Sequence, residues 1–198
     1  MIGNFHKIPA IGLICAGLIA AGYPLQGQDD NERLRAQVHT LKHANLTAPD
    51  GSVSHFSDFK GKLLLISMWA SWCPNCISEF ASFKRLQQMF GKDNVEIILV
   101  GIPDDWAKEQ QFARSHQLDF PIYVFGPSTQ AEIDAVFSRT NGSLSLPQTV
   151  IWDEQRWVKV TQTGAVDWTS SEVLPLMKKT LSCPGDNDKY PLDSPCRD

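Results

Sequence analysis

Two patterns that would assign a function class are missing from this 198-residue chain. Its 18 lysine and arginine residues form no cluster, and against 22 acidic residues they leave a net charge of −4. Proteins that bind nucleic acid usually present a concentrated basic surface, so a nucleic-acid partner is disfavoured. The sequence also has a single C-x-x-C pair and no C-x-x-H, whereas a structural zinc site usually needs four ligands. A zinc site is therefore disfavoured too.

The single C-x-x-C pair, Cys73 and Cys76, lies between two periodic segments. Leu63 to Met68 is an apolar run of strand length, typical of a buried parallel strand. Apolar residues then recur at spacings of three and four, which predicts a helix with one buried face: Phe80, Phe83, Leu86 and Phe90. Pro74 suits the first helical position, where its missing N–H costs nothing. The helix is therefore predicted to begin at the cysteine pair.

This position gives the two cysteines different chemistry. A helix N-terminus offers unpaired N–H groups and a partial positive charge, and both stabilise a thiolate. Cys73 lies where this field is strongest, and Cys76 is close enough to form a disulfide with it. We predict a redox-active pair in which Cys73 attacks a substrate disulfide and Cys76 resolves the mixed disulfide. A static disulfide and half of a zinc site are the alternatives.

The N-terminal segment predicts export. An apolar run from Ile8 to Gly22 follows Lys7 and resembles the hydrophobic region of a secretory signal peptide. The run could extend through Leu25, which approaches the length of a membrane span. We predict a signal peptide or membrane anchor at 1–27, a linker at 28–44, one folded domain at 45–182 and a tail at 183–198. The expected location is the periplasm, either soluble after cleavage or anchored to the inner membrane.

The order of the remaining elements predicts an α/β domain. A hairpin is expected between residues 45 and 59, and a second buried strand at 95–101 makes a parallel crossover with the first. Further along the chain we expect helices at 104–116, 129–137 and 170–181, and strands at 121–125, 149–152 and 158–163. The expected strand at 121–125 and the expected helix at 129–137 lie in the segment from Gly101 to Asn141.

Five short parts of the sequence together match the pattern of one known family. They are Phe59–Lys62, Trp69–Cys73, Cys76, Glu79–Phe80 and Leu146–Val150. Together they resemble the exported thioredoxin-like proteins of the TlpA, ResA and DsbE type. The resemblance implies a thioredoxin-like fold, with a central mixed sheet flanked by helices and an added strand–helix insertion before a cis-proline. It also implies thiol–disulfide oxidoreductase activity.

The resemblance also implies how a substrate is held. Pro147 matches the cis-proline that faces the active-site cysteines in this family, and the backbone of Leu146 would pair with an incoming segment. Trp69, Trp72 and Pro74 are expected to shape the contact surface beside the cysteines. An ordinary loop proline is the alternative for Pro147.

Proton handling is the third implication. Ser67 stands where thioredoxin has a buried aspartate, so that carboxylate is absent here. Glu79 matches a glutamate that this family carries three residues after the second cysteine, and we expect it to replace the aspartate as a catalytic residue. The alternative is that Glu79 only favours the helix dipole.

The expected function is reduction of disulfides in exported proteins. No lysine, arginine or histidine lies between Trp69 and Phe83 to stabilise the Cys73 thiolate further, and a strong oxidant needs a very stable thiolate. We expect no metal or organic cofactor, a membrane thiol–disulfide donor as recycling partner, and a substrate such as an apocytochrome in cytochrome c maturation. A disulfide-forming oxidase, a peroxidase and a redox-inert binding or chaperone module are the alternatives.

The tail generates a prediction of its own. Cys183 and Cys196 bracket an aperiodic segment rich in proline, aspartate and glycine, and in an exported protein the simplest interpretation is a structural disulfide. Under the chain-entropy model it stabilises the fold by about 3 kcal/mol. Peptide mass spectrometry of the non-reduced protein should show the Cys183–Cys196 crosslink. Loss of oxidoreductase activity in the double serine variant, with the fold intact, would indicate a second redox pair instead.

Overall fold

The central strand, β4 (Leu63–Trp69), is buried along its whole length. The structure is a computed structural model that describes residues 5–6, 44–101, 106–125, 139–140, 143–155 and 158–185. Within these residues β4 pairs in parallel with β5 (Val95–Gly101) and antiparallel with β9 (Gln148–Asp153). Strands paired on both sides and covered on both faces are usually apolar throughout, as the Leu63–Met68 run predicts.

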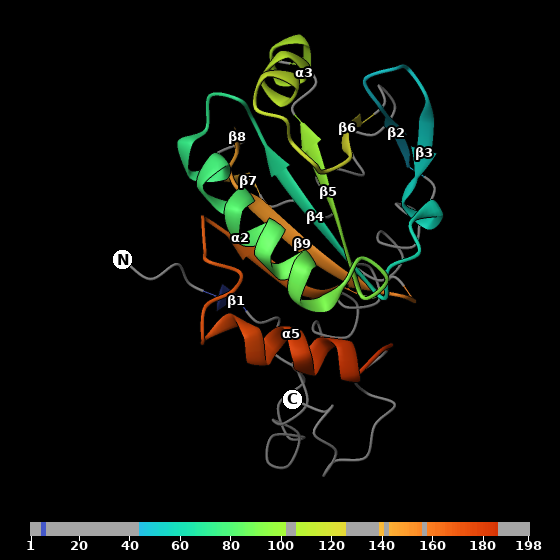
Figure 1. The fold of residues 1–198 in the computed structure, drawn as a ribbon, viewed down its shortest axis with the longest axis vertical. Coiled ribbons are helices and arrows are strands. Elements are labelled where there is room, and N and C mark those ends of the chain that lie inside the picture. Colours follow the sequence, from blue (N-terminus) through green and yellow to red (C-terminus); the bar gives the residue numbers. More distant parts are fainter. Residues whose placement is uncertain are drawn as a thin grey trace, which may run out of the picture.

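The described strands form one eight-stranded mixed sheet and one short two-stranded sheet. The large sheet has the order β1-β10-β9-β4-β5-β6-β2-β3, with the parallel strands at its centre (Figure 1). Its other strands are β1 (Phe5–His6), β2 (Asn45–Thr47), β3 (Val53–His55), β6 (Ile122–Phe125) and β10 (Val158–Thr163). The small sheet pairs β7 (Arg139–Thr140) with β8 (Ser143–Leu144).

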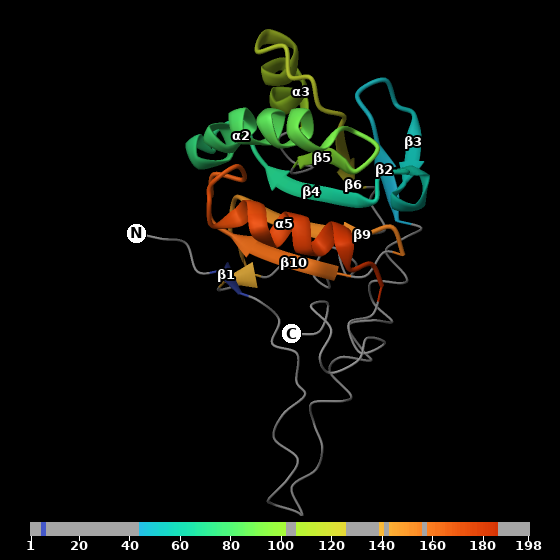
Figure 2. The same ribbon diagram turned by 60° about the horizontal axis from the view of Figure 1, so that its bottom comes forward.

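Among the described residues, three helices pack on one face of the large sheet: α2 (Pro74–Phe90), α3 (Trp106–Ser115) and α5 (Val173–Ser182). Figure 2 shows α2 above β4, with α5 running along β10. Because side chains alternate along a strand, Leu63 and Leu65 enter this helix-covered core while Leu64 and Ile66 enter a second core on the opposite face. The second core includes Phe56, from the short 3₁₀ helix at Phe56–Asp58.

The predicted α/β class and the mixed sheet flanked by helices are confirmed. The hairpin between residues 45 and 59 is present as β2 and β3, and the β4-α2-β5 unit is parallel as expected. The expected strand before the proline is β6, whereas the expected helix at 129–137 lies outside the described residues.

Several element boundaries differ from the prediction by one to three residues, and two of these differences have a clear cause. The last helix starts at Val173 rather than Ser170, because the preceding residues form a turn in which the Val173 N–H bonds to Ser170. The central strand continues to Trp69, one residue beyond the predicted end, since Trp69 still pairs with Gly101. Because Trp69 is part of the strand, its side chain follows the strand alternation and enters the helix-covered core.

At the N-terminus, only Phe5 and His6 of the segment predicted as a signal peptide or anchor are described. They form β1, which pairs antiparallel with β10 at the edge of the sheet. In the part of the chain that the structure describes, no helix combines the length and apolar character needed to cross a membrane. The assignments of 1–27, 28–44, 45–182 and 183–198 stay predictions.

Candidate active site

The two cysteines lie at the start of α2 and are joined in a disulfide, with an S–S distance of 2.05 Å. Cys73 is the N-cap residue, and its Sγ accepts a hydrogen bond from the Cys76 N–H at 3.2 Å. Pro74 occupies the first turn, as its fixed φ predicts. The Cys76 N–H and the positive end of the helix dipole therefore act on Cys73.

The two cysteines differ little in exposure and more in their position on the helix. Cys73 is 5% exposed and Cys76 is 1% exposed, so both cysteines are nearly buried in this disulfide form. The N-cap position, rather than access alone, distinguishes Cys73 as the candidate nucleophile. Pro74 and Asn75, the two residues between the cysteines, are exposed.

The two tryptophans expected at the contact surface lie in different environments. Trp72 is 59% exposed, directly before Cys73. Trp69 is fully buried, with its ring centroid 5.3 Å from that of Phe80 and 5.7 Å from that of Phe112. Trp69 therefore supports the active-site turn from inside the core and does not form part of a contact surface, because strand alternation points it under the helices.

A shallow groove of about 340 Å³ lies beside the active-site turn. One side is formed by Ser71 and Trp72, and the other by α3. The α3 residues that line it are Lys108, Gln111, Phe112 and Ser115. Sequence reasoning missed this wall, because the residues between Cys73 and α3 carry no pattern that places α3 against Trp72.

Pro147 follows a cis peptide bond with Leu146, as the resemblance implied. Pro147 immediately precedes β9, whose Gln148 pairs with Met68 near the end of β4 that leads to the cysteines. The carbonyl of Pro147 accepts a hydrogen bond from the Gly164 N–H at 2.9 Å. The cis-proline loop and the disulfide therefore lie at the same end of the sheet.

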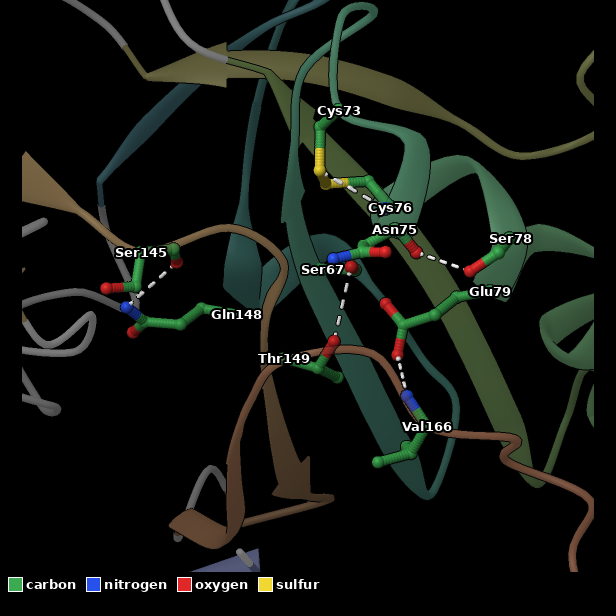
Figure 3. The surroundings of a disulfide bond; sticks show 10 residues. All are labelled: Ser67, Cys73, Asn75, Cys76, Ser78, Glu79, Ser145, Gln148, Thr149 and Val166. Carbon is green, nitrogen blue, oxygen red and sulfur yellow. Dashed lines mark hydrogen bonds between the residues drawn. A yellow bond between two sulfur atoms is a disulfide. The ribbon is translucent and has the colours of Figure 1, made fainter. Parts of the chain in front are cut away.

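Ser67 and Thr149 face each other beneath the disulfide. They are paired across β4 and β9, both are buried, and the Thr149 hydroxyl donates to Ser67 Oγ at 3.2 Å (Figure 3). Ser67 is thus satisfied by a neutral partner and supplies no carboxylate. Any proton acceptor in this core must come from another element.

Glu79 supplies that carboxylate. It lies one turn after Cys76 on α2 and is only 2% exposed. Its Oε1 accepts hydrogen bonds from the Val166 N–H at 3.1 Å and the Trp168 Nε1–H at 2.9 Å, and its Oε2 is buried without a partner (Figure 3 draws the bond to Val166). Glu79 lies beyond the first turn and points inward, which disfavours a role limited to the helix dipole.

Burial raises the pKa of Glu79 from 4.5 to about 7. The hydrogen bonds from Val166 and Trp168 oppose this rise, since they stabilise the charged form. A carboxyl group with a pKa near neutrality can both accept and release a proton at ordinary pH. Sequence reasoning identified Glu79 but not its two donors, which lie 87 and 89 residues further along the chain.

Cys183 lies apart from this site, at the end of α5. It is buried and disulfide-bonded, and its partner lies outside the described residues, so the pairing with Cys196 stays a prediction. Two residues further on, Gly185 is held by Asp153, which accepts a hydrogen bond from its N–H, and by Lys159, which donates to its carbonyl at 2.9 Å.

Across the described ranges, no three His, Cys, Asp or Glu side chains gather as a metal site would require.

The chain is similar to known proteins along most of its length. The Redoxin family model matches residues 35–176. The thiol-disulfide oxidoreductase ResA of Geobacillus kaustophilus is 28% identical over 150 residues, which cover 75% of this chain and 82% of that protein. The thiol:disulfide interchange protein DsbE of Yersinia pestis is 23% identical over 189 residues, covering 89% and 95%.

Solved structures confirm the thioredoxin-like fold. A putative thiol:disulfide interchange protein DsbE from Chlorobium tepidum superposes with a TM-score of 0.56 at 18% sequence identity. The match covers 69% of this chain and 92% of that one.

The raised pKa of Glu79 predicts a pH-dependent stability. The pKa of Glu79 is higher in the folded state than in the unfolded state, so the folded state binds the carboxyl proton more tightly. The resulting contribution to the free energy of unfolding is fully present below pH 4.5 and is lost as the pH rises through 7. The expected loss is about 3 kcal/mol, from about 1.4 kcal/mol per pH unit. Urea unfolding of the oxidised protein between pH 4 and 8 should show this decline in the wild type and lose most of it in Glu79→Gln.

The matched control is Glu154→Gln, at an exposed turn. It should keep the wild-type pH dependence, because its carboxylate stays in water in both states. Identical profiles for Glu79→Gln and the wild type would contradict the buried, protonated state of Glu79.

Proposed function

The chain belongs to the Redoxin family and is a thiol–disulfide oxidoreductase of the ResA and DsbE type, and from this premise we propose that it reduces disulfides in exported proteins on the periplasmic side of the membrane. The observation that carries the proposal is the Cys73–Cys76 disulfide at the N-terminus of α2. The buried carboxylate of Glu79 one turn below it, and the cis-proline loop at the same end of the sheet, support it.

The proposed reaction begins with both cysteines reduced. The Cys73 thiolate attacks one sulfur of the substrate disulfide, forms a mixed disulfide and releases the other substrate sulfur as a thiolate, which takes up a proton. Cys76 then loses its proton and attacks Cys73 Sγ, which releases the second substrate thiol. Two electrons pass to the substrate, and the protein is left with the Cys73–Cys76 disulfide.

Glu79 is proposed to take the Cys76 proton in the second step. Its Oε2 is buried without a hydrogen-bond partner, so it can accept a proton directly or through a water molecule. Its pKa of about 7 leaves the carboxylate partly deprotonated at neutral pH. Ser67, which stands where thioredoxin has a buried aspartate, has no acidic group and cannot take this role.

The substrate is proposed to bind as an extended segment along the cis-proline loop. Among the hydrogen bonds of the described residues, none uses the backbone of Leu146, which leaves its N–H and carbonyl for a substrate strand. Exposed Trp72 and Pro74, with the α3 groove next to Trp72, would contact the flanking side chains. Trp69 is excluded from this surface by its burial.

The reductive direction is argued from charge. Helix α2 supplies its N-terminal dipole, and no cation lies in the 69–83 segment that carries the two cysteines. A moderately stabilised thiolate favours a reducing couple. The proposed partners are a membrane thiol–disulfide donor that re-reduces the pair, and as substrate an apocytochrome, a copper-site assembly factor or a broader set of exported proteins. No metal or organic cofactor takes part.

Replacing the resolving cysteine tests the roles of the two sulfurs. Cys76→Ala should accumulate mixed disulfides with substrate proteins, because Cys73 still attacks and nothing releases the adduct. Non-reducing electrophoresis of the purified, reduced variant after incubation with an oxidised model substrate measures this directly, and the reduced substrate is the blank that should give no adduct. Cys73→Ala is the control and should trap nothing; trapping by Cys73→Ala alone would reverse the assignment of the nucleophile.

The redox direction has a separate test. Equilibration of the domain with glutathione buffers should give a potential nearer thioredoxin, at about −270 mV, than the strong oxidant at about −120 mV, since the helix dipole is the main aid to the thiolate. A value near the strong oxidant would make the protein a disulfide-forming enzyme. Failure to reduce insulin disulfides in any buffer would favour a redox-inert binding module.

A further inference from the structure

Both hydrogen-bond donors to Glu79 come from one short segment, residues 164–169, between β10 and α5. The Val166 N–H and the Trp168 indole N–H converge on the same oxygen, Oε1. Nothing in the local sequence of α2 supplies these donors. The orientation of the Glu79 carboxylate therefore depends on where this segment lies.

The segment is tied to both sides of the active site. At its start, the Gly164 N–H donates to the carbonyl of Pro147 at 2.9 Å. Near its end, the Arg85 guanidinium on α2 contacts Asp167 at 3.2 Å and donates to the Thr169 hydroxyl at 3.1 Å. Asp167 Oδ1 also accepts the Thr169 N–H and hydroxyl, which closes a tight turn around Trp168.

Trp168 is fixed as firmly as the turn that carries it. Its side chain is fully buried, and its ring centroid lies 5.9 Å from that of Phe83, one helical turn after Glu79. The ring packing sets the direction in which the indole N–H points. Because the N–H bonds Oε1 at 2.9 Å, the packing of the ring is converted into the orientation of the carboxylate.

We propose that Trp168 is the positioning residue of this site: its indole N–H holds Glu79 Oε1 and leaves Oε2 free to exchange a proton with the cysteine pair. The proposal deepens the proposed function, since it assumes the role given there to Glu79. In this role Trp168 acts on the chemistry through its hydrogen bond to Glu79, not as a catalytic residue. Val166 contributes a second donor from its backbone N–H, which remains in place when Trp168 is replaced.

The groups around Glu79 define what else affects its titration. On α2 these are the thiols of Cys73 and Cys76 after reduction, and on the 164–169 segment Asp167, which is paired with Arg85 at the surface. Ser67 and Thr149 on the neighbouring strands are uncharged. Burial and the two hydrogen bonds account for the pKa of Glu79 in the disulfide form, so losing one donor has a defined sign.

The test is Trp168→Phe, which keeps an aromatic ring in the core and removes the N–H. A donor to the charged form lowers a carboxyl pKa, so its removal should raise the pKa of Glu79 from about 7 by about one pH unit. The readout is the ¹³C NMR titration of the Glu79 carboxyl carbon in the oxidised protein. Its resonance is assigned by its loss in Glu79→Gln.

Trp152→Phe is the matched control. Trp152 is also fully buried, but it lies in the core on the opposite face of the sheet and its Nε1 has no hydrogen-bond partner. The substitution makes the same change in ring size without removing a bond to Glu79. It should leave the Glu79 titration where the wild type has it.

A second measurement needs no substitution at Trp168. In the wild type, the indole ¹H–¹⁵N signal of Trp168 should shift with the same midpoint as the Glu79 carbon, and this shift should vanish in Glu79→Gln. An unchanged Glu79 midpoint in folded Trp168→Phe, or an indole signal that ignores the Glu79 titration, would reduce Trp168 to a packing residue.

These titrations use the oxidised protein and need no substrate. A failed insulin-reduction assay with both titrations as expected would therefore overturn the proposed function and leave the positioning role intact. An active enzyme without the expected titrations would do the reverse.

Discussion

The structure depends on the complete burial of β4. Its neighbours β5 and β9 satisfy its backbone on both sides, and its alternating side chains enter both cores. Each fully buried leucine or isoleucine stabilises the fold by about 1.5–3 kcal/mol, so the strand cannot shift its register cheaply. Where β4 ends is therefore fixed, and with it the place where the chain turns to begin α2 at Cys73.

The site combines one charge that is stabilised by its surroundings with one that is not. At the N-terminus of α2, the helix field favours the thiolate form of Cys73. One turn below, burial opposes the charged form of Glu79 and raises its pKa to about 7. The two groups thus differ in how readily they hold negative charge, which fits the roles proposed for them: Cys73 as the nucleophile and Glu79 as the acceptor of the Cys76 proton. The 164–169 segment joins this arrangement to the cis-proline loop.

One expectation about a single side chain was wrong: Trp69 does not shape the contact surface. Trp69 belongs to the motif around the cysteines, yet strand pairing extends through it and turns its ring into the core. Cys73 and Cys76 are both nearly buried, although they lie at the start of a helix. Sequence patterns identify which residues lie near the chemistry, whereas exposure depends on elements that pack over them.

By itself the sequence determined the strand, the helix and the cysteine pair at their junction, because hydrophobic periodicity and the proline at the helix start act over a few residues. The resemblance added Pro147 and Glu79. Only the tertiary structure decided that Val166 and Trp168 would hold Glu79, and that α3 would form a groove with Trp72. Those contacts join residues far apart in the chain, and no local pattern records the packing that brings a distant hydrogen-bond donor to a buried carboxylate.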